Sequence, residues 1–162
     1  MMKHNWIFDA SPLIVLGKAD LLSTISPLAE NWIIPEAVIK EVSQKTDIEN
    51  LLNQLSENSK VKRQTIAIEP LIANWNLGNG ETEVLSLAIE NSEYGVILDD
   101  LQARKCAKIL NLPLIGSLGL VVKAKKEGLL EYAKPAFEKL AISGLYFDMD
   151  LIKQVLISIG ED

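Results

Sequence analysis

Short apolar runs alternate along the chain with segments whose apolar residues recur every three or four positions. The runs at residues 6–8, 31–35, 95–98 and 112–115 show no polar alternation, which is typical of strands buried on both faces. Residues 61–68 show a weaker alternation of β-branched residues and are predicted as a strand or an extended connection. The pattern therefore predicts four or five mostly buried strands.

Helical spacing follows each of these runs. It predicts a helix directly after Asp9, a short helix over residues 20–29 broken at Ser26-Pro27, and later helices over residues 36–45, 80–92, 101–110, 118–127, 134–142 and 149–159. Within the polar segment 43–60, one amphipathic helix is predicted from the spacing of Ile48, Leu51, Leu52 and Leu55. Because alternating strands and helices imply a parallel sheet with right-handed crossovers, we expect an α/β fold. Three layers, α/β/α, would surround a central parallel sheet of about four to five strands in a single domain, residues 1–162.

Acidic residues follow two of the predicted strands. Asp9 follows the run 6–8, and Asp99 and Asp100 follow the run 95–98. The carboxyl ends of parallel strands share one edge of the sheet, where open α/β sheets bind ligands, so these acids are candidates for a site. Asp99 and Asp100 are not distinguished by the sequence, because either could cap the helix that follows.

Two further acids lie on the apolar faces of predicted helices. At about 100° per residue, Glu41 falls within the apolar arc of the helix 36–45, and Glu81 lies near the middle of the apolar face of the helix 80–92. Glu83 is predicted to point the opposite way. Glu41 could instead reach solvent or pair with a lysine, and Glu81 could serve the dipole at the start of its helix.

Together these residues predict up to five converging carboxylates with no basic residue among them. Like charges at contact distance raise one another's pKa, so such a cluster holds protons or binds cations. Oxygen ligands favour hard ions such as Mg²⁺ or Mn²⁺, which neutralise phosphate charge and activate water. Phosphoryl transfer to water is therefore the predicted reaction class.

Two serines and an arginine stand near the same edge. Ser11 is predicted as the N-cap of the first helix, with Pro12 in its first turn. Ser117 is most simply the N-cap of the helix 118–127, although its hydroxyl would also lie on the ligand edge. Asp100 and Arg104 have the i,i+4 spacing of an exposed ion pair.

Composition narrows these possibilities. The net charge of −6 argues against a protein that holds nucleic acid by general electrostatics, but cations bound to the acids would remove most of that charge. Cys106 is the only cysteine and His4 the only histidine, so an intrachain disulfide, a Ser-His-Asp or Cys-His pair and a histidine-based zinc site are excluded within one chain. The loop before the helix 80–92 lacks Gly-Lys-Ser/Thr and is not a nucleotide-binding P-loop. The single cysteine fits a reducing compartment, so we expect a cytoplasmic protein. No signal peptide is recognised, and the apolar stretches near residues 12–22 and 112–122 are interrupted by polar residues or Gly, so no membrane span is predicted.

Taken in order, these motifs resemble the PIN-domain family of metal-dependent ribonucleases, many of which are toxins of toxin–antitoxin pairs. The resemblance rests on residues 8–14 (Phe-Asp-Ala-Ser-Pro-Leu-Ile), 34–41 (Ile-Pro-Glu-Ala-Val-Ile-Lys-Glu), 78–83 (Gly-Asn-Gly-Glu-Thr-Glu), 98–104 (Leu-Asp-Asp-Leu-Gln-Ala-Arg) and 116–119 (Gly-Ser-Leu-Gly). The chain is most similar to the branch with a Gly-x-Gly-Glu loop and an Asp-Asp-x-x-Ala-Arg segment.

The resemblance implies that Asp9, Glu41, Glu81 and one or both of Asp99 and Asp100 form the catalytic site and hold Mg²⁺ or Mn²⁺. Ser11 or Ser117 would support these ligands or a water. Glu81 departs from the commoner Asp, and its extra methylene would shift the metal or weaken the site. The family also implies single-stranded RNA as substrate, a homodimer, and an antitoxin that blocks the site.

Candidates for phosphate contacts are Arg104, Lys105 and Lys108, which could equally be a solvated helix face. The first hypothesis is a metal-dependent endoribonuclease that acts as a toxin. The alternative is a catalytically weak or inactive PIN-like module that binds RNA or a protein. A small-molecule phosphatase or phospho-acceptor domain ranks third, because a receiver carries its acid pair after the first strand, whereas here the pair follows the fourth.

Overall fold

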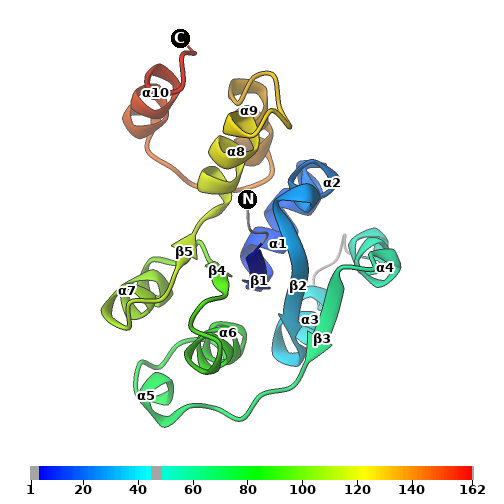
Figure 1. The fold of residues 1–162 in the computed structure, drawn as a ribbon, viewed down its shortest axis with the longest axis vertical. Coiled ribbons are helices and arrows are strands. Elements are labelled where there is room, and N and C mark those ends of the chain that lie inside the picture. Colours follow the sequence, from blue (N-terminus) through cyan, green and yellow to red (C-terminus); the bar gives the residue numbers. More distant parts are fainter. Residues whose placement is uncertain (1–3, 45–48, 162) are drawn as a thin grey trace.

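The computed structural model describes residues 4–44 and 49–161, and five parallel strands within these ranges form one sheet (Figure 1). The strand order is β3-β2-β1-β4-β5. The strands are β1 (His4–Phe8), β2 (Ala29–Pro35), β3 (Val61–Gln64), β4 (Gly95–Ile97) and β5 (Leu114–Ile115). The predicted parallel sheet is confirmed, including a short strand in the weakly patterned segment 61–68.

Helices occupy the segments where the apolar spacing predicts them. They are α1 (Ala10–Lys18), α2 (Leu22–Ile25), α3 (Glu36–Ser43), α4 (Glu49–Glu57), α5 (Pro70–Ala73), α6 (Asn79–Glu90), α7 (Leu101–Ile109), α8 (Ser117–Lys126), α9 (Lys134–Ile142) and α10 (Met149–Ser158). The break at Ser26-Pro27 becomes a 3₁₀ turn, Ser26–Leu28, and the short helix α5 was not predicted. In the predicted amphipathic helix of segment 43–60, Leu51 and Leu55 are buried, whereas Ile48 lies outside the described residues.

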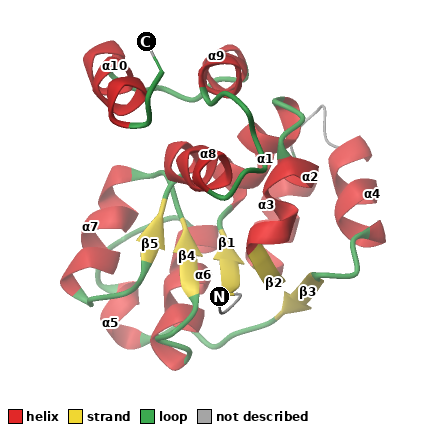
Figure 2. Cartoon of the chain, turned by 45° about the horizontal axis from the view of Figure 1, so that its top comes forward, coloured by secondary structure: helices red, strands yellow, loops and turns green. Residues whose placement is uncertain are grey.

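The strand order explains the three layers. From β1 the chain moves outward through β2 and β3, and it then returns to the other side of β1 for β4 and β5. Right-handed crossovers are expected to place the helices of these outward and returning connections on opposite faces, and at the carboxyl edge α3 of the second connection packs against α6 of the third. The helices surround the sheet in Figure 2, and α6 packs against β1, β2 and β4. The predicted α/β/α architecture is confirmed.

The central strand is the middle of one continuous apolar core. Ile7 and Phe8 have no exposed surface, and the Phe8 ring lies 4.9 Å from the ring of Trp32 on β2. Burial of each such side chain stabilises the fold by about 1.5–3 kcal/mol. No helix in the described part of the chain is long and apolar enough to cross a membrane.

Glu161, which was not among the predicted residues, links the C-terminal end of the described chain to α8 and to the start of α9. Its carboxylate accepts hydrogen bonds from the backbone N–H groups of Ala133 (2.7 Å) and Lys134 (3.0 Å), at the start of α9. Lys125 of α8 donates to the same carboxylate at 3.0 Å. Burial acts to raise the pKa of Glu161, but these three donors together hold that pKa below its ordinary value. Figure 1 shows α9 and α10 beyond α8, near the C-terminus.

Glu161→Gln is expected to destabilise the fold by about 1–3 kcal/mol at neutral pH, because it removes the charge that these donors stabilise. A folded-state pKa below the unfolded value gives stability that is present above the unfolded pKa, about 4.3, and lost as pH falls through the folded pKa. The difference in melting temperature from the wild type should therefore shrink below about pH 4. Glu138→Gln, at an exposed glutamate of α9, is the control and should change little. An equal effect of the two variants would contradict this linking role of Glu161.

Candidate active site

The site lies at the carboxyl ends of the neighbouring strands β1 and β4. Between these two strands the strand order reverses, because β2 and β3 are added on one side of β1 and β4 and β5 on the other. The backbone N–H of Asp9 donates to the carbonyl of Ile97, and that of Leu98 donates to the carbonyl of Ile115, both at 3.1 Å. These bonds extend the strand pairing past β1 and β4, so Asp9 and Asp99 leave the sheet on adjacent strands. Crevices at such points are where open α/β sheets bind ligands.

Asp9 is a buried carboxylate without full compensation. Its exposed fraction is 1%, and its Oδ1 atom has no hydrogen-bond partner among the described residues. Burial raises the pKa of Asp9 well above its ordinary value, and the charges of Glu81, Glu41 and Asp99 raise it further, while the N–H of Ala10 acts in the opposite direction. Four of the five predicted acids therefore interact electrostatically around one buried oxygen.

Glycines at the N-cap and in the first turn of α6 make room for these carboxylates. A β-carbon at Gly80 would lie 3.0 Å from Oε1 of Glu41 and 3.3 Å from Oδ1 of Asp9. A β-carbon at Gly78 would lie only 2.5 Å from Oε2 of Glu81. The Gly-Asn-Gly loop thus leaves space between the acids that any other side chain at residue 80 would fill.

Asp99 is held in place by Ser117. The backbone N–H of Ser117 donates to Oδ1 of Asp99 at 2.8 Å, and its hydroxyl donates to Oδ2 at 2.6 Å. Ser117 is fully buried and is the first residue of α8, whose N-cap is Gly116. The predicted capping role of Ser117 is therefore wrong, because its hydroxyl is already committed to Asp99.

Under the hypothesis of a metal-dependent ribonuclease, Ser117→Ala is expected to lower cleavage about 10- to 100-fold, because Asp99 loses the shorter of its two bonds to Ser117 and with it a fixed orientation. Its cost in stability should be about 1–3 kcal/mol. Ser86→Ala is the matched control, since Ser86 is equally buried and accepts a bond from the N–H of Glu69, away from the acids. The two variants should lose similar stability in thermal unfolding, but only Ser117→Ala should lose activity. An equal loss of activity would assign Ser117 a purely structural role.

Asp100 takes the other role that the sequence left open for the acid pair. Its Oδ2 accepts from the N–H of Ala103 at 3.0 Å, so its side chain caps α7 and remains exposed. Asp100 is not among the charges that raise the pKa of Asp9. The geometry brings Asp99, and not Asp100, into the acid cluster. Within the described ranges, the ion pairs join Arg63 to Glu36 and Lys125 to Glu161, so the predicted pair of Asp100 with Arg104 is not formed.

Two other predictions from helical spacing are corrected. Glu83 does not point away from the protein: it is half-buried, and its Oε1 accepts from the N–H of Ala37 at 3.0 Å, which joins α6 to the first turn of α3. Ser11 is not the N-cap of α1, because the helix starts two residues earlier than predicted, with Asp9 as its N-cap and Ala10 as its first residue. Ser11 is exposed, and no hydrogen bond links its side chain to the acids among the described residues.

The three candidate cations differ in position. Lys105 and Lys108 are exposed on α7, whereas Arg104 is half-buried. Its Nη1 atom and Oδ1 of Asp99 each lie 2.9 Å from the point that a β-carbon at Gly116 would occupy. Arg104 is thus the cation of this group that reaches the acids.

The donor set fits a hard divalent cation. All the groups are carboxylate oxygens, the buried Oδ1 of Asp9 has no hydrogen-bond partner in the described part of the chain, and the space over Gly80 borders two of the acids. Within residues 4–44 and 49–161, no three His, Cys, Asp or Glu side chains already stand close enough to cage an ion. An ion at this site would therefore have to be held through one or two of these carboxylates and several waters, as Mg²⁺ commonly is.

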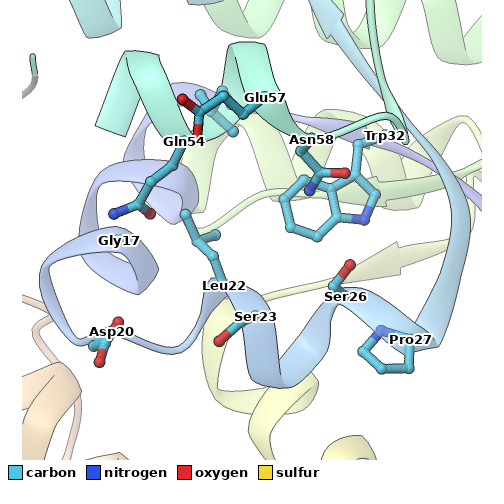
Figure 3. A pocket seen from close by; sticks show the side chains of 11 residues that line it. Gly17, Asp20, Leu22, Ser23, Ser26, Pro27, Trp32, Gln54, Glu57 and Asn58 are labelled. Carbon is cyan, nitrogen blue, oxygen red and sulfur yellow. The ribbon is translucent and has the colours of Figure 1, made fainter. Parts of the chain in front are cut away.

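A separate cavity of about 580 Å³ opens between the end of α1, α2 and the end of α4 (Figure 3). Its lining includes Asp20, Gln54, Glu57 and Asn58, and among the described residues that line it there is neither a Lys nor an Arg, nor any of the acids around Asp9. Because α1 runs from the carboxyl edge of β1 to the start of the next strand, its end lies at the opposite edge of the sheet. This cavity is therefore distinct from the acid cluster.

Comparison with known proteins gives the following matches. A family model described as PIN domain matches residues 5–161. No curated protein matches the chain. Among solved structures, a PilT N-terminus domain protein, SSO1118 of Sulfolobus solfataricus P2, aligns with a TM-score of 0.48 and 16% sequence identity over 89% of this chain and 97% of that chain.

Proposed function

The chain belongs to the PIN-domain family, whose fold is of a nuclease type, and from this premise we propose that it is a Mg²⁺- or Mn²⁺-dependent endoribonuclease acting on single-stranded RNA. The observation that carries the proposal is the buried Oδ1 of Asp9, which has no hydrogen-bond partner among the described residues and feels the charges of Glu41, Glu81 and Asp99. A cluster of this kind is electrostatically unfavourable by itself and is relieved by a cation.

Asp9, Glu41, Glu81 and Asp99 are the residues that would hold the ion. When bound, it would neutralise charge on a phosphodiester and lower the pKa of water. Asp9 offers a desolvated carboxylate, in which electrostatic interactions are stronger than in water. Ser117 fixes both oxygens of Asp99, so this ligand is oriented before substrate arrives. Gly80 leaves the space between Glu41 and Asp9 open for an ion or a phosphate oxygen.

The wider biological role follows the family resemblance. We propose a cytoplasmic toxin of a toxin–antitoxin pair that works as a homodimer and is blocked by its antitoxin. Support for this role comes from the resemblance of the motifs at residues 8–14, 78–83 and 98–104 to those of such toxins. An adjacent gene for a small partner protein, and co-purification of the two products, would test it.

The second candidate is a PIN-like module that binds RNA or a protein and cuts weakly or not at all. It is favoured by the spacing of the acids, because no three of the described ligand-type side chains form a ready-made cage. Glu81 is also longer than the Asp that is commoner in the family. Calorimetric titration with Mn²⁺ separates the two candidates, since the binding module predicts no metal affinity at the acids.

The test of the proposed function is cleavage of an end-labelled single-stranded RNA by the purified protein in Mn²⁺, in Mg²⁺ and in EDTA. Asp9→Asn, purified identically, controls for a contaminating nuclease. Cleavage that requires the metal and is lost in the variant supports the ribonuclease. Equal cleavage by both proteins contradicts it, and no cleavage by either one favours the binding module.

A further inference from the structure

Arg104 is half-buried beside carboxylates but forms no ion pair with any described carboxylate, which is unusual for a cation. It lies on α7, four residues after the cap Asp100, and it is half-buried beside the acid cluster. The guanidinium Nη1 and Oδ1 of Asp99 share the space over Gly116, each 2.9 Å from the position of a β-carbon there. A side chain at residue 116 would therefore displace the guanidinium, the carboxylate or both.

The neighbouring carboxylates are already occupied with other donors. Oδ2 of Asp100 accepts from the N–H of Ala103, and both oxygens of Asp99 accept from Ser117. None of the hydrogen bonds and ion pairs of the described residues uses the guanidinium of Arg104. Its five N–H donors, arranged in a rigid planar fork, therefore remain available to an anion that enters from the acid site.

We propose that Arg104 binds a phosphate group of the nucleic-acid strand at the acid site, through the two non-bridging oxygens of that phosphate. The proposal rests on the proposed function and adds the residue that holds the strand. A guanidinium pairs with phosphate in a bidentate manner, which lysine cannot do. The position beside Asp99 places the bound phosphate next to the carboxylates. Lys105 and Lys108, which extend into solvent from the same helix, lack this position.

Binding is the first test, in a background that does not cut. In Asp9→Asn in EDTA, where no cleavage is expected, the affinity for a fluorescently labelled single-stranded RNA is measured by anisotropy at several salt concentrations. Adding Arg104→Gln should weaken binding about 10-fold and reduce the slope of log K against log [salt] by about 0.7, the value for one phosphate contact on a single strand. Lys105→Gln is the matched control and should change both quantities much less. Equal effects of the two substitutions would overturn the proposal.

Cleavage by the otherwise unmodified protein is the second test. Arg104→Gln is expected to lower kcat/KM about 10- to 100-fold, and Arg104→Lys should restore only part of it, because lysine keeps the charge but loses the fork. Melting temperatures of the variants identify any general loss of fold. A wild-type rate in Arg104→Gln would contradict the proposal and leave the ribonuclease intact. Arg104-dependent binding without cleavage by any variant would support the phosphate contact and contradict the ribonuclease.

Discussion

Replacing Asp9 by asparagine is expected to abolish metal-dependent cleavage and, at the same time, to make the metal-free protein more stable. Asp9 is 1% exposed, and its Oδ1 has no hydrogen-bond partner among the described residues. Asparagine keeps the shape of the side chain but removes the charge that burial and the neighbouring acids oppose. Cleavage should fall at least about 100-fold, whereas the free energy of unfolding in EDTA should rise by about 1–3 kcal/mol.

The stability difference between the wild type and Asp9→Asn should depend on pH. Burial, followed by the charges of Glu81, Glu41 and Asp99, raises the folded-state pKa of Asp9 above its unfolded value of about 3.9. The favourable contribution of its protonated form is complete below the unfolded pKa and is lost as pH rises through the folded pKa. In EDTA, the melting temperature of the wild type should therefore fall relative to that of Asp9→Asn as pH increases over this interval. Saturating Mn²⁺ should raise the wild-type melting temperature and have much less effect on the variant.

Asp100→Asn is the control for Asp9→Asn. Asparagine caps a helix as well as aspartate does. Asp100, the exposed residue of the Asp99-Asp100 pair, caps α7. We expect it to keep the stability of the wild type and to change cleavage by less than about threefold. Loss of cleavage in Asp100→Asn would return this residue to the metal site. Lower stability of Asp9→Asn in EDTA would show that the charge of Asp9 is compensated in the folded protein.

The sequence predicted those features that depend on periodicity and chain order. Unalternated apolar runs located the central strands, and the positions of Asp9 and Asp99 after two of them required only that the sheet be parallel. The helical periodicity of about 100° per residue placed Glu41 and Glu81 on the inner faces of their helices. The charges of both residues raise the pKa of Asp9. These predictions needed only apolar runs, helical periodicity and the rule that the carboxyl ends of parallel strands share one edge of the sheet.

Partners from distant segments could not be predicted in this way. Helical periodicity gave the direction of Glu83 around the axis of α6. It could not show that the backbone nitrogen of Ala37 lies 3.0 Å from Oε1 of Glu83. In the same way, the bond from Ser117 to Asp99 depends on how α8 follows β5, and the three bonds to Glu161 depend on the packing of the C-terminal helices. Which of Asp99 and Asp100 caps α7 likewise depended on which carboxylate reached the N–H of Ala103.

A methyl group at residue 80 is expected to close the acid site without harming the fold. In Gly80→Ala, the new β-carbon would lie 3.0 Å from Oε1 of Glu41 and 3.3 Å from Oδ1 of Asp9. Residue 80 is helical and its φ is not positive, so alanine fits the backbone of α6 and is favoured there over glycine by about 0.5–1 kcal/mol. Mn²⁺ affinity by calorimetry and cleavage should therefore both fall at least about 10-fold, while the melting temperature in EDTA stays level or rises.

Gly17→Ala provides the matched control, because it also adds a methyl group to a helical glycine in a tight place. Its β-carbon would lie 2.9 Å from Cδ1 of Leu51, the flexible end of an apolar side chain remote from the acids. We expect some change in stability but unchanged Mn²⁺ affinity and cleavage in that variant. Wild-type metal binding and cleavage in Gly80→Ala would mean that the space between Glu41 and Asp9 is not where the ion or the phosphate enters. Selective loss in Gly80→Ala would locate the reaction in that space, independently of any change to the acids themselves.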